Sequence, residues 1–232
     1  MIKVIGFDLD DTLWALRPIM MRAEKLLKKW LSENVPQLQY DLIESQTLRQ
    51  EILTESPDLD GKVTELRRRI IARALALSKL DEDAIDTLTS AAMEVFLAAR
   101  NEVEFFDGAL EVIKQLSENY TLGALTNGNA DISRIGLARY FSFAFSAEQV
   151  GAPKPAPDLF ARALAHNNVD PQEMIYVGDD PVLDIDTANY LSLRTIWVNT
   201  QRRDDRGKTD PDVTIEDIKD LPEAVYQIVQ SE

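Results

Sequence analysis

The sequence predicts an α/β fold in which a parallel, Rossmann-like sheet carries an inserted helical bundle. An apolar run at residues 2–8 is typical of a buried strand, whereas residues 15–100 show few strand signals and a helical spacing of apolar side chains. After Glu104, helical and strand patterns alternate, which is typical of a parallel sheet with crossover helices. We therefore expect the first strand to join the later sheet. Residues 1–14 and 101–232 would form the core domain around the insertion.

Four helices are expected within the insertion. Their apolar residues recur every three or four positions, which places them on one face of a helix. Turn-forming sequences at residues 34–36, at residues 56–58 and at Asp81 separate the helices. The second helix is expected over 41–53. The other three helices have the apolar stripes Ile19, Ala23, Leu26, Leu27, Trp30 and Leu31; Val63, Leu66, Ile70, Ala74 and Leu77; and Ile85, Leu88, Ala92, Val95 and Phe96.

The remainder of the core domain is predicted as an alternation of helices and strands. The polar residues 201–212 indicate a loop, and a helix from Ile215 or Leu221 to Gln230 would follow it. The expected helices are 108–118, 130–139, 156–167 and 181–191, and the expected strands are 120–126, 143–147, 174–177 and 195–198.

The composition excludes several classes of protein. Hydrophobic residues make up 45% of the 232 residues, enough for a sizeable core, and the absence of cysteine excludes disulfides and thiolate chemistry. The formal net charge of −15 predicts no binding to nucleic acid or to anionic membranes. A core-type strand at the start leaves no room for a signal peptide, so we expect a cytoplasmic protein, either a monomer or a homodimer.

Two carboxylates follow the first strand, and this is the most informative feature of the chain. Asp8 and Asp10 are two residues apart, so they start on the same side of the strand. They lie where open α/β sheets place their ligands, and carboxylates so close together need a cation or a proton between them. The alternative is a capped strand end with solvated carboxylates and Thr12 as a helix cap. That alternative does not account for the polar groups found later in the chain.

Two further segments contain groups that could bind an anion. Thr126, Asn127 and Gly128 follow a predicted strand and offer a hydroxyl and main-chain N–H donors, although such a sequence is also an ordinary turn. Lys154 lies between Pro153 and a proline that we expect at the start of a helix. A lysine on a stiff segment can act as a point charge for phosphate. Alone, a solvated surface lysine is the simpler interpretation.

A fourth segment adds carboxylates at the end of another strand. Gly178 and Asp179 follow the strand, and Asp184 comes about one helical turn later. Oxygen ligands of this kind suit Mg²⁺, which takes only a few protein carboxylates. An acidic helix N-terminus is the alternative interpretation.

Together these segments resemble the haloacid dehalogenase (HAD) superfamily. All four of its motifs are present in order: Asp8-Leu9-Asp10-Asp11-Thr12, Thr126, Lys154, and Gly178-Asp179 with Asp184. The helical insertion, residues 15–100, resembles the C1-type cap of that superfamily.

This resemblance implies a phosphatase that forms an aspartyl-phosphate. Asp8 would be the nucleophile and Asp10 the general acid and base. Thr126 and Lys154 would hold the transferring phosphoryl group. The implied cofactor is Mg²⁺, with Asp8, Asp179, Asp184 and the main-chain carbonyl of Asp10 as the candidate ligands. Asp184 would bind the metal through water or orient Lys154, and the sequence does not decide between these roles.

Short sequence strings favour one group of substrates. Two segments are similar to bacterial phosphatases of riboflavin metabolism: Phe7 to Leu13 followed by Arg17-Pro18, and Thr126 to Ala130. Those enzymes act on flavin mononucleotide (FMN) or on 5-amino-6-(5-phosphoribitylamino)uracil. Trp14 and Arg17 could line the leaving-group pocket, although packing of Trp14 is an equal alternative. Asn127 is a further candidate for substrate binding.

Other functions remain open at this point. A nucleoside monophosphate or a sugar phosphate is the alternative substrate. A 2-haloacid dehalogenase is disfavoured, because that branch generally lacks an aspartate at the position of Asp10. A non-catalytic binding module is disfavoured by the complete set of motif residues.

Overall fold

The computed structural model describes residues 1–38, 42–204 and 206–231, apart from the side chains of residues 42–44. The chain divides into two compact units. The first, the sheet unit, consists of Met1–Ala15 and Glu104–Glu232. The second, the helical unit, is Leu16–Val103.

The described part of the sheet unit contains one six-stranded sheet in which all neighbours are parallel. The strand order is β3-β2-β1-β4-β5-β6, so the first strand lies in the middle. Strands β2 and β3 lie on one side of β1, and the later strands β4 to β6 lie on the other. The strand order therefore reverses between β1 and β4, and sheets of this kind bind ligands at such a switch point. The strands are β1 (Val4–Phe7), β2 (Thr121–Thr126), β3 (Phe141–Ser146), β4 (Met174–Gly178), β5 (Arg194–Val198) and β6 (Val213–Ile215).

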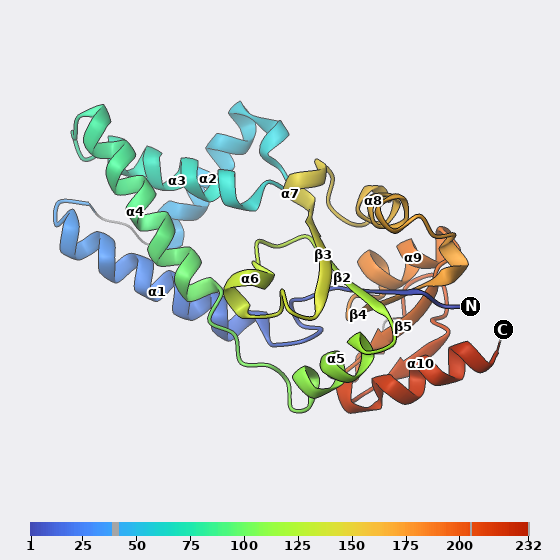
Figure 1. Ribbon diagram of the computed structural model, residues 1–232. Coiled ribbons are helices and arrows are strands. Elements are labelled where there is room, and N and C mark those ends of the chain that lie inside the picture. The colour runs from blue at the N-terminus through green and yellow to red at the C-terminus, as the bar shows by residue number, and fades with distance from the viewer. Residues whose placement is uncertain (39–41, 205, 232) are drawn as a thin grey trace. The chain divides into compact units, whose positions relative to one another are not determined.

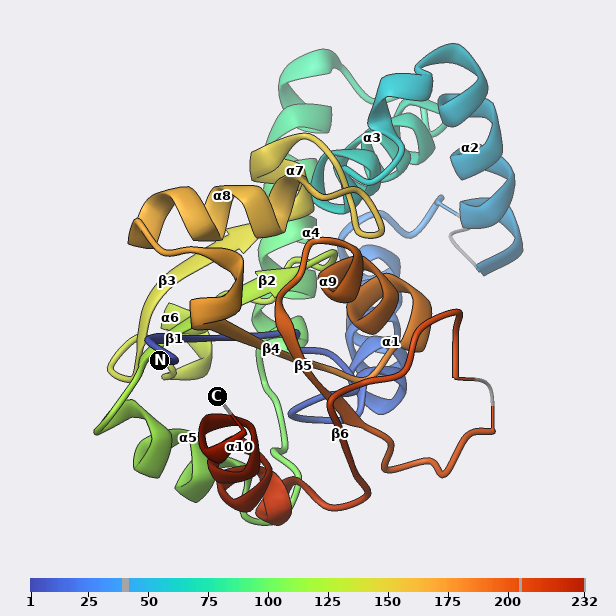
Figure 2. The same ribbon diagram turned by 90° about the vertical axis from the view of Figure 1, so that its right-hand side faces the viewer.

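Helices cover both faces of this sheet (Figures 1 and 2). On one face α5 (Ala109–Ser117) lies beside α10 (Leu221–Gln230), and on the other lie α8 (Asp158–Asn167) and α9 (Thr187–Tyr190). The strands are therefore buried on both sides, which explains why their residues form apolar runs rather than an alternating pattern. Short helices α6 (Ile132–Ile135) and α7 (Ala147–Val150) flank β3 along the chain.

The helical unit is a bundle with its own apolar core. Helix α4 packs against α1 and α3, and α3 packs against α2. The side chain of Asp81 caps α4 by accepting a hydrogen bond from the main-chain N–H of Ala84 at 2.8 Å. The helices are α1 (Leu16–Asn34), α2 (Leu42–Glu55), α3 (Val63–Ala76) and α4 (Glu82–Arg100), and the core includes Ala23, Leu27, Leu31, Leu66, Ile70, Ala74, Ala92 and Phe96.

The predicted fold class is confirmed, and several details of the prediction are wrong. Leu77 is 63% exposed, because α3 ends one residue before it. The helix predicted over 130–139 shrinks to α6, because Gly136 ends it in a left-handed conformation at φ 86°. Strand β6 was not predicted, since three residues after a polar segment give no periodic signal. Residue 41, where the second helix was predicted to begin, lies outside the described residues.

Two helix boundaries near the motifs also differ from the prediction. Helix α8 begins at Asp158, so Pro155 precedes it instead of starting it. Residues Pro181–Asp186 form a π-helical turn before α9, where one continuous α-helix was predicted. Among the described residues, no helix combines the length and the apolar character needed to cross a membrane.

Candidate active site

Three polar motif residues of the sheet unit lie at the carboxyl ends of three adjacent strands. Asp8 follows the central strand β1, Thr126 is the last residue of β2, and Asp179 follows β4. Because β2, β1 and β4 are parallel neighbours, these ends meet at one edge of the sheet. The main-chain N–H of Asp8 donates to the carbonyl of Val177 at 2.8 Å, which continues the pairing of β1 with β4 to the site.

Lys154 is the centre of this cluster. Its Nζ lies 2.6 Å from Oδ1 of Asp8 and 2.7 Å from Oδ1 of Asp184. It also donates to the hydroxyl of Tyr176 at 2.9 Å and to the carbonyl of Leu125 at 3.0 Å. Lys154 is only 4% exposed, so the interpretation as a solvated surface lysine is wrong.

The charge of Lys154 is maintained by its neighbours. Burial acts to lower the pKa of Lys154, but the carboxylates of Asp184 and Asp8 act more strongly together, so the pKa lies well above its usual range. The ammonium group is therefore a fixed positive charge beside Asp8. Such a charge can stabilise negative charge that develops on a bound group.

Asn127 fixes the segment that carries Lys154. Its amide Nδ2 donates to the carbonyl of Lys154 at 3.0 Å, and its Oδ1 accepts from the main-chain N–H of Lys154 at 2.7 Å. The side chain that was predicted to contact substrate therefore holds the lysine segment in place. The neighbouring Thr126 accepts a hydrogen bond from the N–H of Gly128 at 2.9 Å and is 4% exposed, so a tight turn leads out of β2 at the site.

Asp184 reaches the site because β4 ends in a glycine and a π-helical turn follows. A Cβ on Gly178 would come within 2.5 Å of the Asp184 carboxylate, so only glycine permits this close approach. Asp180 caps the turn by accepting from the N–H groups of Val182 at 2.9 Å and Leu183 at 2.8 Å. Local departures of this kind from α-helical geometry are frequent at functional sites.

Three carboxylates of this edge could hold a metal ion. Asp8, Asp179 and Asp184 each offer an oxygen, and these oxygens lie within 4.8 Å of one another. Burial, the charges of Asp184 and Asp11, and a weaker effect of Asp180 raise the pKa of Asp179 to about 7, against the opposing charge of Arg203. Burial also raises the pKa of Asp8 well above its usual range. Carboxylates forced together in this way, all with oxygen donors, fit a divalent cation such as Mg²⁺.

Asp10 lies outside that carboxylate cluster and is oriented by a tryptophan. The indole Nε1 of Trp14 donates to Oδ1 of Asp10 at 2.9 Å. Trp14 is fully buried and makes an edge-to-face contact with Phe105, their ring centroids 5.6 Å apart. The environment supports the packing alternative for Trp14 and does not support ring stacking on a substrate.

Sequence reasoning missed Tyr176 because it reads as one more apolar residue of a buried strand. Its hydroxyl donates to the carbonyl of Leu125 at 3.0 Å and accepts from Lys154. Its ring makes an edge-to-face contact with Phe160 at 4.7 Å between centroids. Only the pairing of β4 with β1, which itself lies beside β2, brings this hydroxyl to the lysine.

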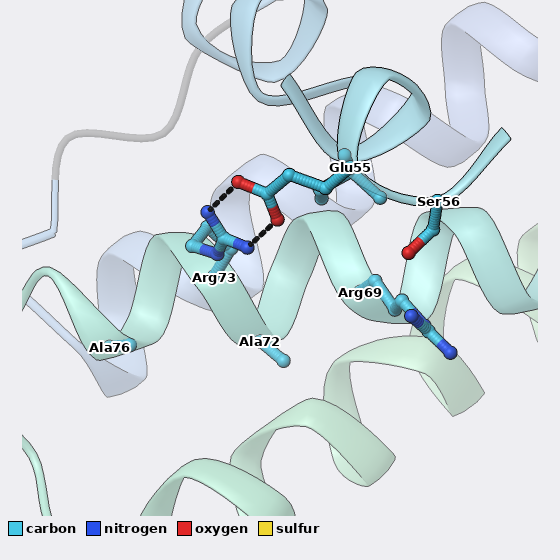
Figure 3. Close-up of a pocket in the computed structure, with 7 residues that line it drawn as sticks. Glu55, Ser56, Arg69, Ala72, Arg73 and Ala76 are labelled. Carbon is cyan, nitrogen blue, oxygen red and sulfur yellow. Dashed lines mark hydrogen bonds and ion pairs between the residues drawn. The ribbon is translucent and has the colours of Figure 1, made fainter. Parts of the chain in front are cut away.

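The helical unit contains the remaining predicted residue and a separate cavity. Arg17 lies in the first turn of α1 with an exposed side chain, and its role in substrate binding stays a prediction. A cavity of about 290 Å³ is lined by Ile52, Glu55, Ser56, Arg69, Ala72, Arg73 and Ala76. Arg73 forms two hydrogen bonds with Glu55 there (Figure 3), and Arg69 bonds Glu65 at 2.9 Å. Since carboxylates compensate both cations, we assign no catalytic role to this cavity.

A family model described as haloacid dehalogenase-like hydrolase matches residues 2–191. The chain belongs to this family. The matched residues include every motif residue placed above at the edge of the sheet. The recognition of this family from the four motifs is therefore confirmed.

Known relatives of this HAD-like hydrolase include named phosphatases. It is 31% identical over 204 residues to 5-amino-6-(5-phospho-D-ribitylamino)uracil phosphatase YigB from Escherichia coli K12, covering 88% of this chain and 86% of YigB. It is 27% identical over 247 residues to glyceraldehyde 3-phosphate phosphatase from Methanopyrus kandleri, covering 99% and 100%. With the family match, these relatives confirm the predicted enzyme class, a HAD-type phosphatase.

A solved structure of the family bears a different activity in its name. It is the crystal structure of 2-haloacid dehalogenase from Pseudomonas syringae pv. Tomato DC3000. The match has a TM-score of 0.94 and 38% identity and covers 98% of this chain and 99% of the other.

Proposed function

We propose that this HAD-like hydrolase is a Mg²⁺-dependent phosphomonoesterase that works through an aspartyl-phosphate on Asp8. The observation that carries the proposal is that Asp8 contacts a buried lysine and lies in a cluster with two further carboxylates, with Asp10 two residues later. This arrangement provides a nucleophile, a fixed positive charge, a cation site and a candidate acid at one edge of the sheet.

In the first step an oxygen of Asp8 attacks the phosphorus of the substrate. Lys154 contacts the same carboxylate at 2.6 Å, so its charge lies where the phosphoryl oxygens gain charge. Thr126 at the end of β2 would contact another phosphoryl oxygen. Asp10 protonates the departing alkoxide and later removes a proton from the water that hydrolyses the aspartyl-phosphate. The hydrogen bond from Trp14 fixes the orientation of Asp10 for both transfers.

Asp8, Asp179 and Asp184 are the side chains proposed to hold Mg²⁺, with the main-chain carbonyl of Asp10 as a ligand implied by the family. The bound ion would offset the repulsion between these carboxylates and a phosphate dianion. Asp184 also contacts Lys154 and accepts the main-chain N–H of Asp180 at 3.1 Å, which favours its role in orienting the lysine.

The proposed substrate is FMN or 5-amino-6-(5-phosphoribitylamino)uracil. Support comes from the activity in the name of the YigB relative and from the resemblance of the motif strings. We propose that residues 15–100 act as a cap over the leaving group, with Arg17 as a substrate contact, on the core of residues 1–14 and 101–232. The cytoplasmic location and the monomeric or dimeric state stay predictions of the sequence.

The alternative function is dehalogenation of a 2-haloacid, which the name of the Pseudomonas syringae structure favours. A dehalogenase releases halide and has no alkoxide to protonate. The orientation of Asp10 by Trp14 therefore favours the phosphatase.

A substrate panel tests these alternatives. Inorganic phosphate release is measured from FMN, the ribitylaminouracil phosphate, nucleoside monophosphates and sugar phosphates, with Mg²⁺ and with EDTA. Halide release is measured from a 2-chloro acid. We expect Mg²⁺-dependent phosphate release with the highest kcat/KM for a riboflavin-pathway substrate. A hexose phosphate that exceeds FMN by more than about tenfold, or about 1.4 kcal/mol, would overturn the substrate assignment. Halide release without phosphate release would overturn the phosphatase.

A further inference from the structure

We propose that Arg203, in the loop after β5, is a positioning residue that holds Asp179 ready to bind the metal. The inference rests on the proposed function only in taking Asp179 as a metal ligand. Arg203 lies outside the four motifs that identify the family and beyond residues 2–191 of the family match.

Arg203 contacts Asp179 at both its main chain and its side chain. Its Nη2 donates a hydrogen bond to the carbonyl of Asp179 and lies 3.6 Å from Oδ2 of the carboxylate. The indole Nε1 of Trp197 donates to the same carbonyl at 2.8 Å. Two donors from the end of β5 and its loop therefore fix the residue that follows β4.

Arg203 is itself held in place by an asparagine. Nδ2 of Asn199 donates to the carbonyl of Arg203 at 2.9 Å, and Oδ1 of Asn199 accepts the N–H of Arg203 at 2.8 Å. Asn199 is buried directly after β5. The pair of bonds closes a short turn that presents the guanidinium to Asp179.

The far end of the loop has a second anchor. The buried carboxylate of Asp186 accepts hydrogen bonds from the N–H of Lys208 at 2.9 Å and from the N–H and hydroxyl of Thr209 at 2.7 Å each. Gly207 permits this contact, since its φ is 69° and a Cβ would lie 2.8 Å from Oδ2 of Asp186. A segment that sequence alone predicts as loop is thus attached at both ends.

The geometry indicates that Arg203 helps metal binding instead of competing with it. Its hydrogen bond goes to the carbonyl, while 3.6 Å to the carboxylate is too long for a hydrogen bond. The guanidinium therefore orients the carboxylate, while the carboxylate oxygens can still bind a metal ion. The charges of Asp184, Asp11 and Asp180 repel the Asp179 carboxylate. That carboxylate is held at Oδ1 by a hydrogen bond of 3.3 Å from the hydroxyl of Thr12 and at Oδ2 by the nearby charge of Arg203. Partners of this kind in the second layer of a metal site typically contribute about 10- to 100-fold in metal affinity.

The test compares Arg203→Met with a matched control, Arg202→Met. Arg202 is the adjacent residue of the same loop, is 78% exposed and pairs with Glu216 at 2.9 Å. Mg²⁺ affinity is measured without substrate, by the rise of Tm when metal-free protein is titrated with Mg²⁺. Mn²⁺ binding followed by electron paramagnetic resonance is a second measurement. We expect about 10- to 100-fold weaker binding for Arg203→Met and an unchanged affinity for Arg202→Met. Arg203→Lys should be intermediate, since it keeps the charge and loses the planar donor group.

Kinetics separate positioning from a general loss of structure. At saturating Mg²⁺ the kcat of Arg203→Met should remain within about threefold of wild type and the substrate KM should be unchanged, while the half-saturating Mg²⁺ concentration rises. Equal or tighter Mg²⁺ binding by Arg203→Met would overturn the inference. A wild-type protein that binds no Mg²⁺ would instead overturn the proposed metal role. If Arg203→Met does not fold, Arg203→Lys and Asn199→Ala decide the question, and wild-type affinity in both overturns the inference.

Discussion

We expect the free energy of unfolding of the metal-free protein to fall as the pH rises from about 5 to 7. In the folded chain the pKa of Asp179 is raised from 3.8 to about 7 by burial and by neighbouring carboxylates. Between these values the folded state keeps a proton that the unfolded state releases. The stabilisation is therefore complete below the unfolded value and is lost as the pH rises through the folded value.

The size of the effect follows from the shift. Each pH unit in this window corresponds to about 1.4 kcal/mol, so two units give at most about 3 kcal/mol, and we expect about 2 because the carboxylate is partly exposed. Burial raises the pKa of Asp8 as well, which acts with the same sign. Glu55, Glu173 and Asp186 have lowered pKa values and act with the opposite sign, but their unfolded values of 3.8–4.5 place most of that effect below pH 5.

The assay is thermal unfolding in EDTA at pH 5, 6 and 7. A loss of about 2 kcal/mol corresponds to a fall in Tm of roughly 4–8 °C for a chain of this length. Asp179→Asn is the control and should lose most of the slope. Saturating Mg²⁺ should remove the fall in wild type, since the metal binds the deprotonated carboxylates. A Tm that stays level or rises between pH 5 and 7 in EDTA, or an equal slope in Asp179→Asn, would refute the reasoning.

Three substitutions test the roles of single side chains. Asp8→Asn should abolish phosphate release while circular dichroism shows a folded protein, because the attacking oxygen is lost; wild-type turnover would contradict the mechanism. Asp10→Asn should lower kcat by about 10²- to 10⁴-fold and leave the Mg²⁺-induced rise in Tm unchanged, since its carboxylate lies outside the acidic cluster. Tyr176→Phe removes the hydroxyl that contacts Lys154 and should cost about 1 kcal/mol in urea unfolding, with a severalfold lower kcat; full activity would show that the other contacts suffice.

The fold was predictable where the periodicity was strong. Helices α1, α3 and α4 carry long apolar stripes, and strands β1, β2 and β4 are apolar runs between turn signals, so both kinds of element could be recognised. Short elements were missed or misjudged. Strand β6 exists because Ile196, Trp197 and Val198 of β5 offer a free edge, which is a tertiary reason. The turn at Pro181–Asp186 leaves the α-helical geometry to place Asp184, and its sequence still reads as a helix.

The motif residues of the site were predictable, and the contacts that support them were not. Recognisable strands end at or just before Asp8, Thr126 and Asp179, and Lys154 lies in a proline-rich segment. The residue types at these positions indicate their chemistry. Trp14 was recognised as a residue of interest, but whether it stacks on a substrate or bonds Asp10 depends on the path of the turn after β1. That turn includes Asp11 at φ 60° and a bond from its N–H to the carbonyl of Trp14 at 2.7 Å.

Tyr176 and Arg203 show why supporting residues escape a sequence reading. Tyr176 lies on β4 and Lys154 in a loop before α8, and they meet only because β4 pairs with β1 beside β2. Arg203 reaches Asp179 through a turn closed by Asn199 and the side-by-side pairing of β4 and β5. A nucleophile or a metal ligand must be one of a few residue types at a strand end, so its position can be recognised locally. A positioning residue needs only to reach its target from a neighbouring element. That requirement depends on the tertiary structure, so the sequence does not reveal it.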